Sequence, residues 1–294
     1  MLTNPGRNRF AAYRDLMDSM EFKPSRRLGQ NFLLDPSLHR VLVDAADPQP
    51  GDLVLEVGPG LGFLTRELSG RARTLAVEVD GRLHKIMSGE LSDFVCGGAS
   101  IRLLHCDALK SSRIHPQVLE ALAQERATHT GRFLVIANLP YAISGPLLAE
   151  LASLPSPPDE LAVLIQLELA QRIAAQPGTK DYGALSVQLQ LGYEPSILRK
   201  VGAQVFRPRP QVDSAMLHLA PRAEGYVGLG PMDRQGLGVF LRQIFAGRRK
   251  KLRNAKVLAG RVVAPHLEHL LELRPDAVAP NEFLGLFCHL GENP

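Results

Sequence analysis

Short runs of apolar residues alternate with stretches of helical periodicity through the first two thirds of the chain. Five such runs read as strands, at 52–58, 73–80, 100–108, 132–141 and 161–166. Helical stretches lie between and around them, near 36–46, 62–69, 81–91, 116–127, 144–153 and 167–175. Apolar strands that alternate with helices predict a parallel sheet covered on both faces, which is a doubly wound α/β fold.

The pattern changes at both ends of the chain. Residues 7–20 have the spacing of a short amphipathic helix, and an irregular basic segment follows it. The runs 196–206 and 214–221 resemble a closing pair of strands, and a glycine-rich linker and short helical patterns come after them. The predicted parts are an N-terminal helix with its covering segment, a sheet domain and a small helical domain, at 1–35, 36–221 and 222–294.

Composition is that of an ordinary globular protein, with 294 residues of which 45% are apolar. The three cysteines have no metal-ligand spacing, so we expect a reducing compartment and no metal. No apolar run reaches the length of a membrane span, and the N-terminus lacks the apolar core of a signal peptide. The expectation is a soluble, cytoplasmic protein without a membrane partner.

The net charge of +4 is concentrated in one segment. Residues 248–256, "RRKKLRNAK", carry six positive charges and no negative one, which leaves the rest of the chain at −2. Such a local patch is typical of a surface that meets nucleic acid phosphates. The alternative is a solvated helix face, because charge runs are common on surfaces.

The predicted strands end in residues that suit a nucleoside cofactor. Gly58, Gly60 and Gly62 allow a tight turn and a close approach of backbone to ligand. Glu78 follows Gly58 by twenty residues, at the end of the next strand, where a carboxylate can accept hydrogen bonds from a ribose. Position 63 is Phe, so the G-x-G-x-x-G turn typical of NAD or FAD sites is absent. Asp107, after the third strand, is either an acceptor for an adenine amine or a helix N-cap.

The fourth strand ends in "ANLPY", residues 137–141. Asn and Pro are turn residues, so a simple turn is one interpretation. With the glycine turn, Glu78 and Asp107, however, the stretch resembles the class I S-adenosylmethionine-dependent methyltransferases, whose sheet is Rossmann-like.

A larger set of motifs resembles one family, the ribosomal RNA adenine dimethyltransferases. The set comprises "LGQNFLLD" (28–35), "EVGPGLGFLT" (56–65), "NLPY" (138–141), "KDYGALSVQLQ" (180–190), "FRPRPQVDSA" (206–215) and "FAGRRKKLRN" (245–254), the last of which resembles the family's basic helix. Within the family, the set points to members that dimethylate N6 of two adjacent adenosines near the 3′ end of small-subunit (16S) rRNA. The resemblance therefore implies S-adenosylmethionine as cofactor and rRNA in a pre-30S particle as partner; we expect a monomer.

The resemblance also assigns roles to single residues. It implies that cofactor contacts come from Asn31, Leu33, Gly58, Gly60, Glu78, Asp107 and Asn138. Gly58 would lie against the methionine part, Glu78 on the ribose, and Asp107 on the adenine.

The proposed chemistry is centred on Asn138, Leu139, Pro140 and Tyr141. An exocyclic adenine amine is a poor nucleophile because its lone pair is delocalised into the ring. The Asn138 amide oxygen and the Leu139 carbonyl can hold the N–H groups so that the lone pair faces the methyl group. Pro140 restricts Leu139 to extended backbone, and Tyr141 offers a face on which a flipped base can stack.

Further residues are assigned to rRNA contact. Phe206 either walls the base pocket or is a core aromatic at a strand end. Phosphate contacts are expected from Arg207, Arg209, Arg248, Arg249, Lys250, Lys251 and Arg253, with an affinity that falls steeply with salt.

Three alternatives remain open. One is a large-subunit rRNA adenine methyltransferase of the macrolide-resistance type, and another is a DNA adenine methyltransferase. The third is a non-catalytic assembly or transcription factor that keeps the methyltransferase fold.

Overall fold

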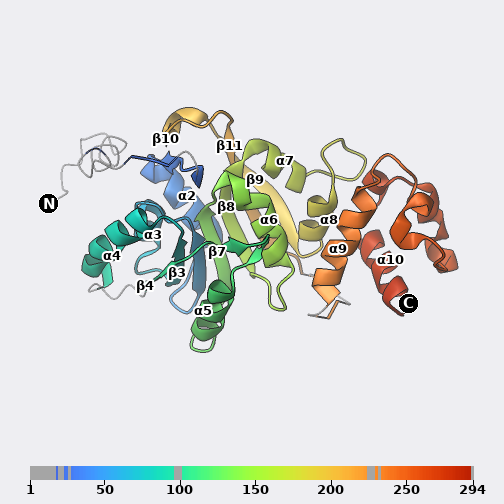
Figure 1. Ribbon diagram of the computed structural model, residues 1–294, viewed down its shortest axis with the longest axis horizontal. Coiled ribbons are helices and arrows are strands. Elements are labelled where there is room, and N and C mark those ends of the chain that lie inside the picture. Colours follow the sequence, from blue (N-terminus) through green and yellow to red (C-terminus); the bar gives the residue numbers. More distant parts are fainter. Residues whose placement is uncertain are drawn as a thin grey trace.

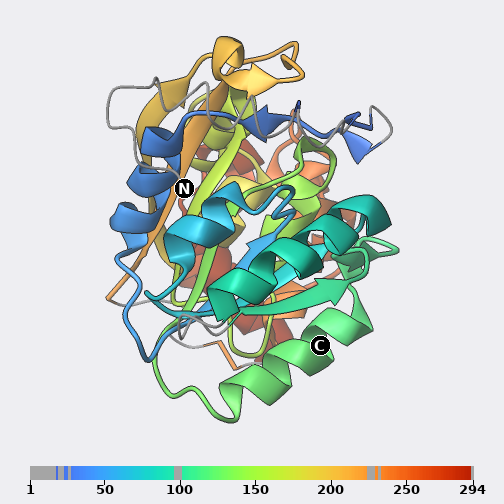
Figure 2. The same ribbon diagram turned by 90° about the vertical axis from the view of Figure 1, so that its left-hand side faces the viewer.

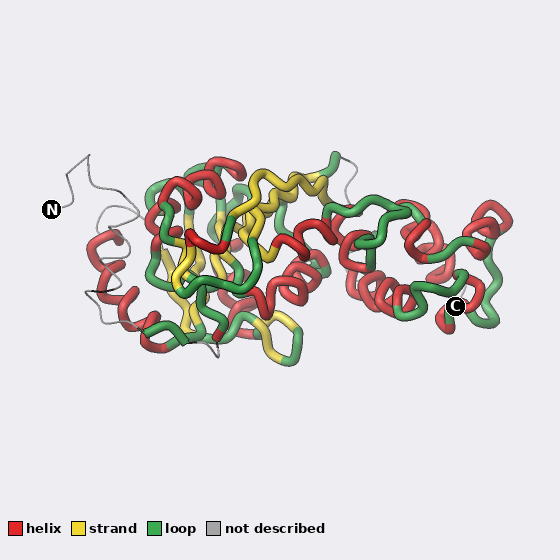
Figure 3. Tube along the Cα trace, turned by 90° about the horizontal axis from the view of Figure 1, so that it is seen from above, coloured by secondary structure: helices red, strands yellow, loops and turns green. Residues whose placement is uncertain are grey.

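The computed structural model describes residues 18, 23–25, 28–95, 101–223, 229–230 and 233–292. Apart from Asp18, the predicted helix at 7–20 lies outside the described residues, and so does half of the linker at 222–233. Figure 1 shows an elongated molecule with a sheet-containing part and a helical C-terminal part. Figure 3 gives the same division seen from above.

A seven-stranded sheet forms the centre of the larger part, in the order β4-β3-β2-β7-β8-β11-β9. The strands are β2 (Leu53–Val57), β3 (Arg73–Glu78), β4 (Ile101–His105), β7 (Phe133–Asn138), β8 (Glu160–Gln166), β9 (Tyr193–Val201) and β11 (Ser214–Pro221). The first five in spatial order are parallel, and β11 runs antiparallel between β8 and β9. The predicted parallel sheet and its closing pair of strands are confirmed.

Helices cover both faces of this sheet (Figure 2). They are α2 (Pro36–Ala46), α3 (Phe63–Leu68), α4 (Gly81–Val95), α5 (Pro116–Arg126), α6 (Tyr141–Ala152) and α7 (Leu167–Ile173). Along β7, Phe133, Val135 and Ala137 belong to the core shared with α5, α6 and α7. Leu134 and Ile136 belong to the core shared with α2 and α3. A strand buried on both faces is apolar at every position, which is why these strands are continuous apolar runs.

Several short strands have no signal in the sequence. β1 (Phe32–Leu33) pairs with β10 (Phe206–Arg207), and β5 (Leu109–Lys110) pairs with β6 (Arg113–Ile114) in a hairpin. Two residues are too few to show any periodicity, so only the tertiary structure reveals these pairs.

The C-terminal part has its own apolar core. It contains α9 (Asp233–Phe245), α10 (Pro280–Glu292) and the 3₁₀ turns η3 (Leu252–Asn254), η4 (Lys256–Leu258), η5 (Pro265–Glu272) and η6 (Pro275–Ala277). Tyr182 and, from α8 (Ala184–Gln190), Val187 also belong to this core, and the hydroxyl of Tyr182 donates to the carbonyl of Val278 at 3.0 Å. The three domain boundaries drawn from the sequence stay a prediction. Tyr182 and Val187 precede the predicted boundary at residue 222 in sequence, yet they pack in the core of the helices that follow it.

The motif "KDYGALSVQLQ" has a structural role in the described chain. On α8, buried Gln188 donates to the carbonyl of Ala149 in α6 at 2.9 Å. Buried Gln190 donates to the carbonyl of Ile173, the last residue of α7, at 2.8 Å. The amides thereby satisfy carbonyls at the C-terminal ends of two helices that both begin at the carboxyl edge of the sheet.

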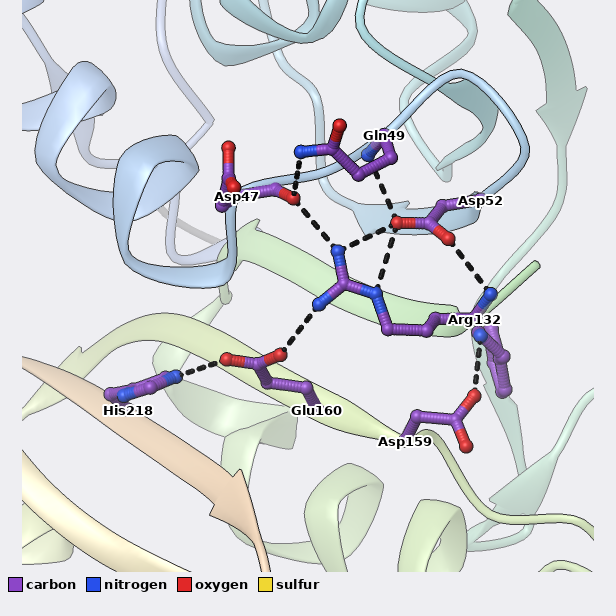
Figure 4. A network of polar contacts seen from close by, with 8 residues as sticks. Asp47, Gln49, Asp52, Arg132, Asp159, Glu160 and His218 are labelled. Carbon is purple, nitrogen blue, oxygen red and sulfur yellow. Dashed lines mark hydrogen bonds and ion pairs between the residues drawn. The ribbon is translucent and has the colours of Figure 1, made fainter.

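A polar network ties the loops and strands together at the amino edge of the sheet (Figure 4). Arg132 donates from Nη2 and Nε to Asp52 at 2.8 and 3.1 Å, and from Nη1 to Glu160 at 3.0 Å. Glu160 in turn lies 2.6 Å from Nε2 of His218 on β11. The network joins the entries to β2, β7 and β8 and crosses to β11.

Within the described ranges, none of the helices combines the length and the apolar composition that crossing a membrane requires.

Candidate active site

A cavity that opens to solvent lies at the carboxyl ends of the parallel strands. Every residue predicted for cofactor contact or for catalysis lines it: Asn31, Leu33, Gly58, Gly60, Glu78, Asp107, Asn138, Leu139, Pro140 and Tyr141. In doubly wound sheets the ligand site lies where the strand order reverses, here between β2 and β7. The topology therefore brings together residues spread over more than a hundred positions of the chain.

The turn after β2 forms the floor of the cavity and leaves no space for side chains. Gly58 and Gly60 have φ angles of 73° and 61°, which L side chains rarely adopt. A Cβ on Gly58 would lie 3.1 Å from Cγ of Pro140, and one on Gly60 would lie 2.9 Å from Cε1 of Phe32. The bare backbone is thus available to a ligand.

Glu78 connects this turn to the end of β3. Its Oε2 accepts from the amide of Gly60 at 3.1 Å, and its Oε1 accepts from the amide of Asp80 at 2.8 Å. Burial raises the pKa of the Glu78 carboxyl, and the two backbone hydrogen bonds offset part of that rise. The carboxylate is therefore fixed in place while its remaining lone pairs stay available to hydroxyl donors.

Asp107 follows β4 and is exposed at the cavity. Its Oδ1 accepts from the amide of Leu109 at 3.1 Å, in the turn that enters the β5–β6 hairpin. No helix begins here, because α5 starts at Pro116 with His115 as its N-cap. The helix N-cap interpretation of Asp107 is therefore wrong.

The segment before α2 crosses the cavity and is held on two sides. Gln30 donates to Asp80 at 2.9 Å, and β1 pairs with β10, which Figure 2 shows as the blue segment beside the gold one. Asp80 also accepts from Arg82, and these bonds lower its pKa well below the usual range. Sequence analysis missed Gln30, although it lies in the motif "LGQNFLLD" next to Asn31.

The "NLPY" tip presents one side-chain amide and one carbonyl to the cavity. Nδ2 of Asn138 donates to the carbonyl of Asn31 at 3.4 Å, so its Oδ1 is the atom left to accept. Leu139 donates its amide to Leu164, and within the described part of the chain its own carbonyl accepts no hydrogen bond. Tyr141 begins α6 with its ring half-buried and its hydroxyl 2.6 Å from Oγ of Ser214.

Known proteins resemble this chain in sequence and in fold. The profile of the family described as ribosomal RNA adenine dimethylase matches residues 21–281. The chain belongs to this dimethylase family. The predicted identity as an rRNA adenine dimethyltransferase is thereby confirmed.

Relatives of the dimethylase cover most of its length. "Ribosomal RNA small subunit methyltransferase A" of Geobacillus kaustophilus is 37% identical over 257 residues, which cover 86% of this chain and 81% of the relative. The protein of the same name from Moorella thermoacetica is 38% identical over 269 residues, covering 90% and 89%.

Solved structures show the same fold. A dimethyladenosine transferase from Plasmodium falciparum superposes with a TM-score of 0.68 at 24% identity, covering 88% of this chain and 96% of its own. The 23S rRNA methyltransferase ErmE superposes with a TM-score of 0.61 at 26% identity, covering 88% and 99%. The predicted Rossmann-like methyltransferase fold is confirmed.

Two buried ionisable groups of the dimethylase site were missed by sequence analysis. Burial raises the pKa of Glu56 to about 8, although Thr65 donates to it at 2.7 Å, and the nearby Glu78 raises it further. Burial lowers the pKa of His39, which lines the cavity, to about 4. Glu56 begins the quoted motif "EVGPGLGFLT" but was given no role, and His39 gave no signal because it is one polar position in an amphipathic helix.

The residues predicted for rRNA contact lie apart from the cavity lining. Phe206 is 5% exposed and packs in the core with Leu33, its partner across β1 and β10. Arg207 and Arg209 are exposed, and Arg207 pairs with Asp18 at 3.0 Å. Of the two interpretations of Phe206, a wall of the base pocket or a core aromatic at a strand end, its position fits the core aromatic.

The basic run is not the helix that the sequence predicted. Residues 246–249 form turns, and η3 and η4 follow; α9 ends at Phe245, two residues before Gly247, a residue type that disfavours helix. Lys251 and Arg253 both pair with Glu272, at 2.7 and 2.6 Å. The side chains of Arg249 and Lys250 are exposed and have no hydrogen-bond or ion-pair partner within the described ranges.

No group of three or more His, Cys, Asp or Glu side chains that could hold a metal occurs in the part of the chain that the structure describes.

Proposed function

We propose that this dimethylase transfers methyl groups from S-adenosylmethionine to N6 of two adjacent adenosines near the 3′ end of small-subunit (16S) rRNA. The acceptor is a pre-30S particle in the cytoplasm. The observation that carries the proposal is the shared cavity, where the "NLPY" tip faces the Gly58 turn, Glu78 and Asp107. The names of the relatives, which act on the small ribosomal subunit, support this choice of substrate.

The residues present fit S-adenosylmethionine, which when bound supplies a methyl group on a positively charged sulfur. The cavity is lined by backbone of the glycine turn, by carboxylates and by apolar side chains, a mixture usual for small-ligand sites. Gly58 and Gly60 keep the turn in a positive-φ conformation that lines the cavity with backbone, and a Cβ at either position would crowd Pro140 or Phe32. Glu78 and Asp107 supply carboxylate oxygens for the ribose hydroxyls and the adenine amine.

Asn138 and Leu139 orient the amine that accepts the methyl group. Asn138 uses its Nδ2 on the N-terminal segment, which turns its Oδ1 toward an incoming N–H. The Leu139 carbonyl supplies the second acceptor. With both N–H groups held, the amine pyramidalises and its lone pair faces the methyl donor. Orientation of the amine then accounts for most of the lowering of the barrier, because the methyl donor is already activated.

Pro140 and Tyr141 hold the target base in place. The ring of Pro140 lies against Gly58, so the tip is braced on the cofactor turn. Burial raises the pKa of the Tyr141 phenol, which keeps it neutral. A base stacked on its ring gains about 1–3 kcal/mol, which compensates part of the cost of leaving the RNA stack.

The exposed cations position the RNA. Arg249, Lys250 and Lys256 have exposed side chains with no ion-pair partner in the described part of the chain, whereas Lys251 and Arg253 share Glu272. We therefore expect Arg249→Ala and Lys250→Ala each to reduce the salt dependence of rRNA binding by about one released counterion. Arg253→Ala is the matched comparison and should reduce it less.

The direct test compares two acceptors. Purified protein is incubated with radiolabelled S-adenosylmethionine and either unmethylated pre-assembled small subunits or protein-free large-subunit rRNA. Label in the small subunit, recovered as N6,N6-dimethyladenosine by mass spectrometry, is the expected result. Label found solely in large-subunit rRNA would instead favour an activity like that of ErmE. The absence of label in both acceptors, with cofactor binding intact, would favour a non-catalytic assembly factor.

A further inference from the structure

The hydroxyl of Tyr141 is held by a residue from a different strand. Its oxygen lies 2.6 Å from Oγ of Ser214, the first residue of β11. Stacking requires the face of the tyrosine ring and not its hydroxyl, so this contact does something other than provide the platform.

Ser214 is a rigid anchor. It is fully buried, and its backbone pairs with Gln166 of β8 on one side and Val201 of β9 on the other. The preceding residue, Asp213, accepts from the amide of Ala203 at 3.1 Å with its side chain. It also accepts from the amide of Leu167 at 3.0 Å with its carbonyl. The hydroxyl of Ser214 therefore has a fixed position relative to three strands of the sheet.

We propose that Ser214 is a positioning residue for methyl transfer, which fixes the ring plane of Tyr141 and so the plane of the stacked adenine. The proposal rests on the proposed function. It gives the motif "FRPRPQVDSA" a role at the active site through Ser214, whereas Phe206 of the same motif lies in the core.

The second methyl transfer depends on this constraint more than the first. An unmethylated adenine amine is oriented both by the stack and by two N–H contacts, to Asn138 and Leu139. After one transfer a single N–H remains, so the stack provides a larger share of the orientation. A loosened ring plane therefore slows the second step more than the first.

The test measures Ser214→Ala, Tyr141→Phe and the double variant on unmethylated small subunits. Losing one hydrogen bond should lower kcat/KM for each single variant about three- to tenfold. N6-monomethyladenosine should accumulate, while the dissociation constant for S-adenosylmethionine stays within about twofold of the wild type. Because Ser214 acts through the phenol, the double variant should lose less than about twofold beyond Tyr141→Phe.

Ser153→Ala is the matched control. Ser153 is also buried, donates to the carbonyl of Ala149 at 2.8 Å and accepts from Gln188, at the opposite end of α6. This variant should lower Tm as Ser214→Ala does, yet leave the ratio of monomethyl to dimethyl product unchanged. A smaller folded fraction slows both transfers by the same factor, so it leaves that ratio unchanged when the variants are compared at equal total methylation.

Two results would overturn the assignment of Ser214 alone. One is a wild-type product ratio and kcat/KM in Ser214→Ala, and the other is a full multiplication of the two single losses in the double variant. If the wild-type protein itself places no methyl group on small subunits, the proposed function fails and the role of Ser214 fails with it.

Discussion

At the amino edge of the central sheet, Arg132 donates hydrogen bonds to Asp52 and Glu160. At the carboxyl edge, Glu56 and Glu78 form no ion pair within the described chain, and burial is the main influence on both carboxyls. The pKa of Asp52 shows the first situation: burial would raise it, but hydrogen bonds from Gln49 and Arg132 bring it below its ordinary value. The pKa values of Glu56 and Glu78 show the second, because burial raises both.

The difference separates stability from function. Removing one partner of a buried charge is destabilising, because the other charge is left without compensation. A carboxylate whose acceptors are all used within the protein also has no free acceptor for a ligand. Polar groups at the carboxyl edge keep unused acceptors, such as Oδ1 of Asn138 and the carbonyl of Leu139, which cost stability and can bind substrate. Substitutions at the two edges should therefore change different measurements.

The largest effect is expected at the carboxyl edge. Asn138→Ala removes an acceptor for the adenine amine and should lower kcat on the order of 100-fold, the usual loss for one preorganised polar group. Tm should change little, because the Asn138 side chain makes one long hydrogen bond in the protein. Single-turnover methylation and calorimetry check this, and wild-type turnover in the variant would refute the proposed chemistry.

At the amino edge, Arg132→Met should lower the free energy of unfolding by about 2 kcal/mol, with unchanged turnover per folded molecule. The variant leaves Asp52 and Glu160 without their cation, and the 38% exposure of the Arg132 side chain keeps the loss moderate. Urea titration measures it. The matched control is Arg71→Met, whose ion pair with Asp44 is exposed and should be worth less than about 1 kcal/mol.

Glu78→Ala should weaken S-adenosylmethionine binding on the order of tenfold, or about 1.4 kcal/mol, because ribose hydroxyls lose their acceptor and Gly60 loses its partner. At saturating cofactor, kcat should recover most of its value, unlike that of Asn138→Ala. Isothermal titration calorimetry measures the affinity. An affinity equal to that of the wild type would place the ribose elsewhere.

The last effect is a slope of stability with pH. The pKa of Glu56 is raised from 4.5 to about 8 on folding, so protonated Glu56 stabilises the fold fully below pH 4.5. That contribution is lost as pH rises toward about 8, by at most about 1.4 kcal/mol per pH unit. Glu56→Gln should flatten this decline in urea titrations between about pH 5 and about pH 8. Identical slopes in the two proteins would show that Glu56 ionises normally.

Much of the fold and of the site could be predicted from local sequence. Each strand of the parallel sheet is a separate apolar run, so each is visible without knowledge of its neighbours. The turn at Gly58, Glu78, Asp107 and the "NLPY" tip are short motifs at strand ends, and a parallel sheet places such ends at one edge. The basic run was visible too, but the helix that the family resemblance implied for it was wrong, because α9 ends at Phe245, before the run begins.

The sequence by itself determined the order of strands and helices, the family, and the residues that meet at the carboxyl edge. The tertiary structure alone decided the pairs between distant positions. It placed Ser214 against Tyr141 and Arg132 between Asp52 and Glu160, and it buried Phe206 beneath β1. Such pairs depend on strand register and on how loops cross the sheet. Local sequence patterns reveal neither the strand register nor the path of the loops.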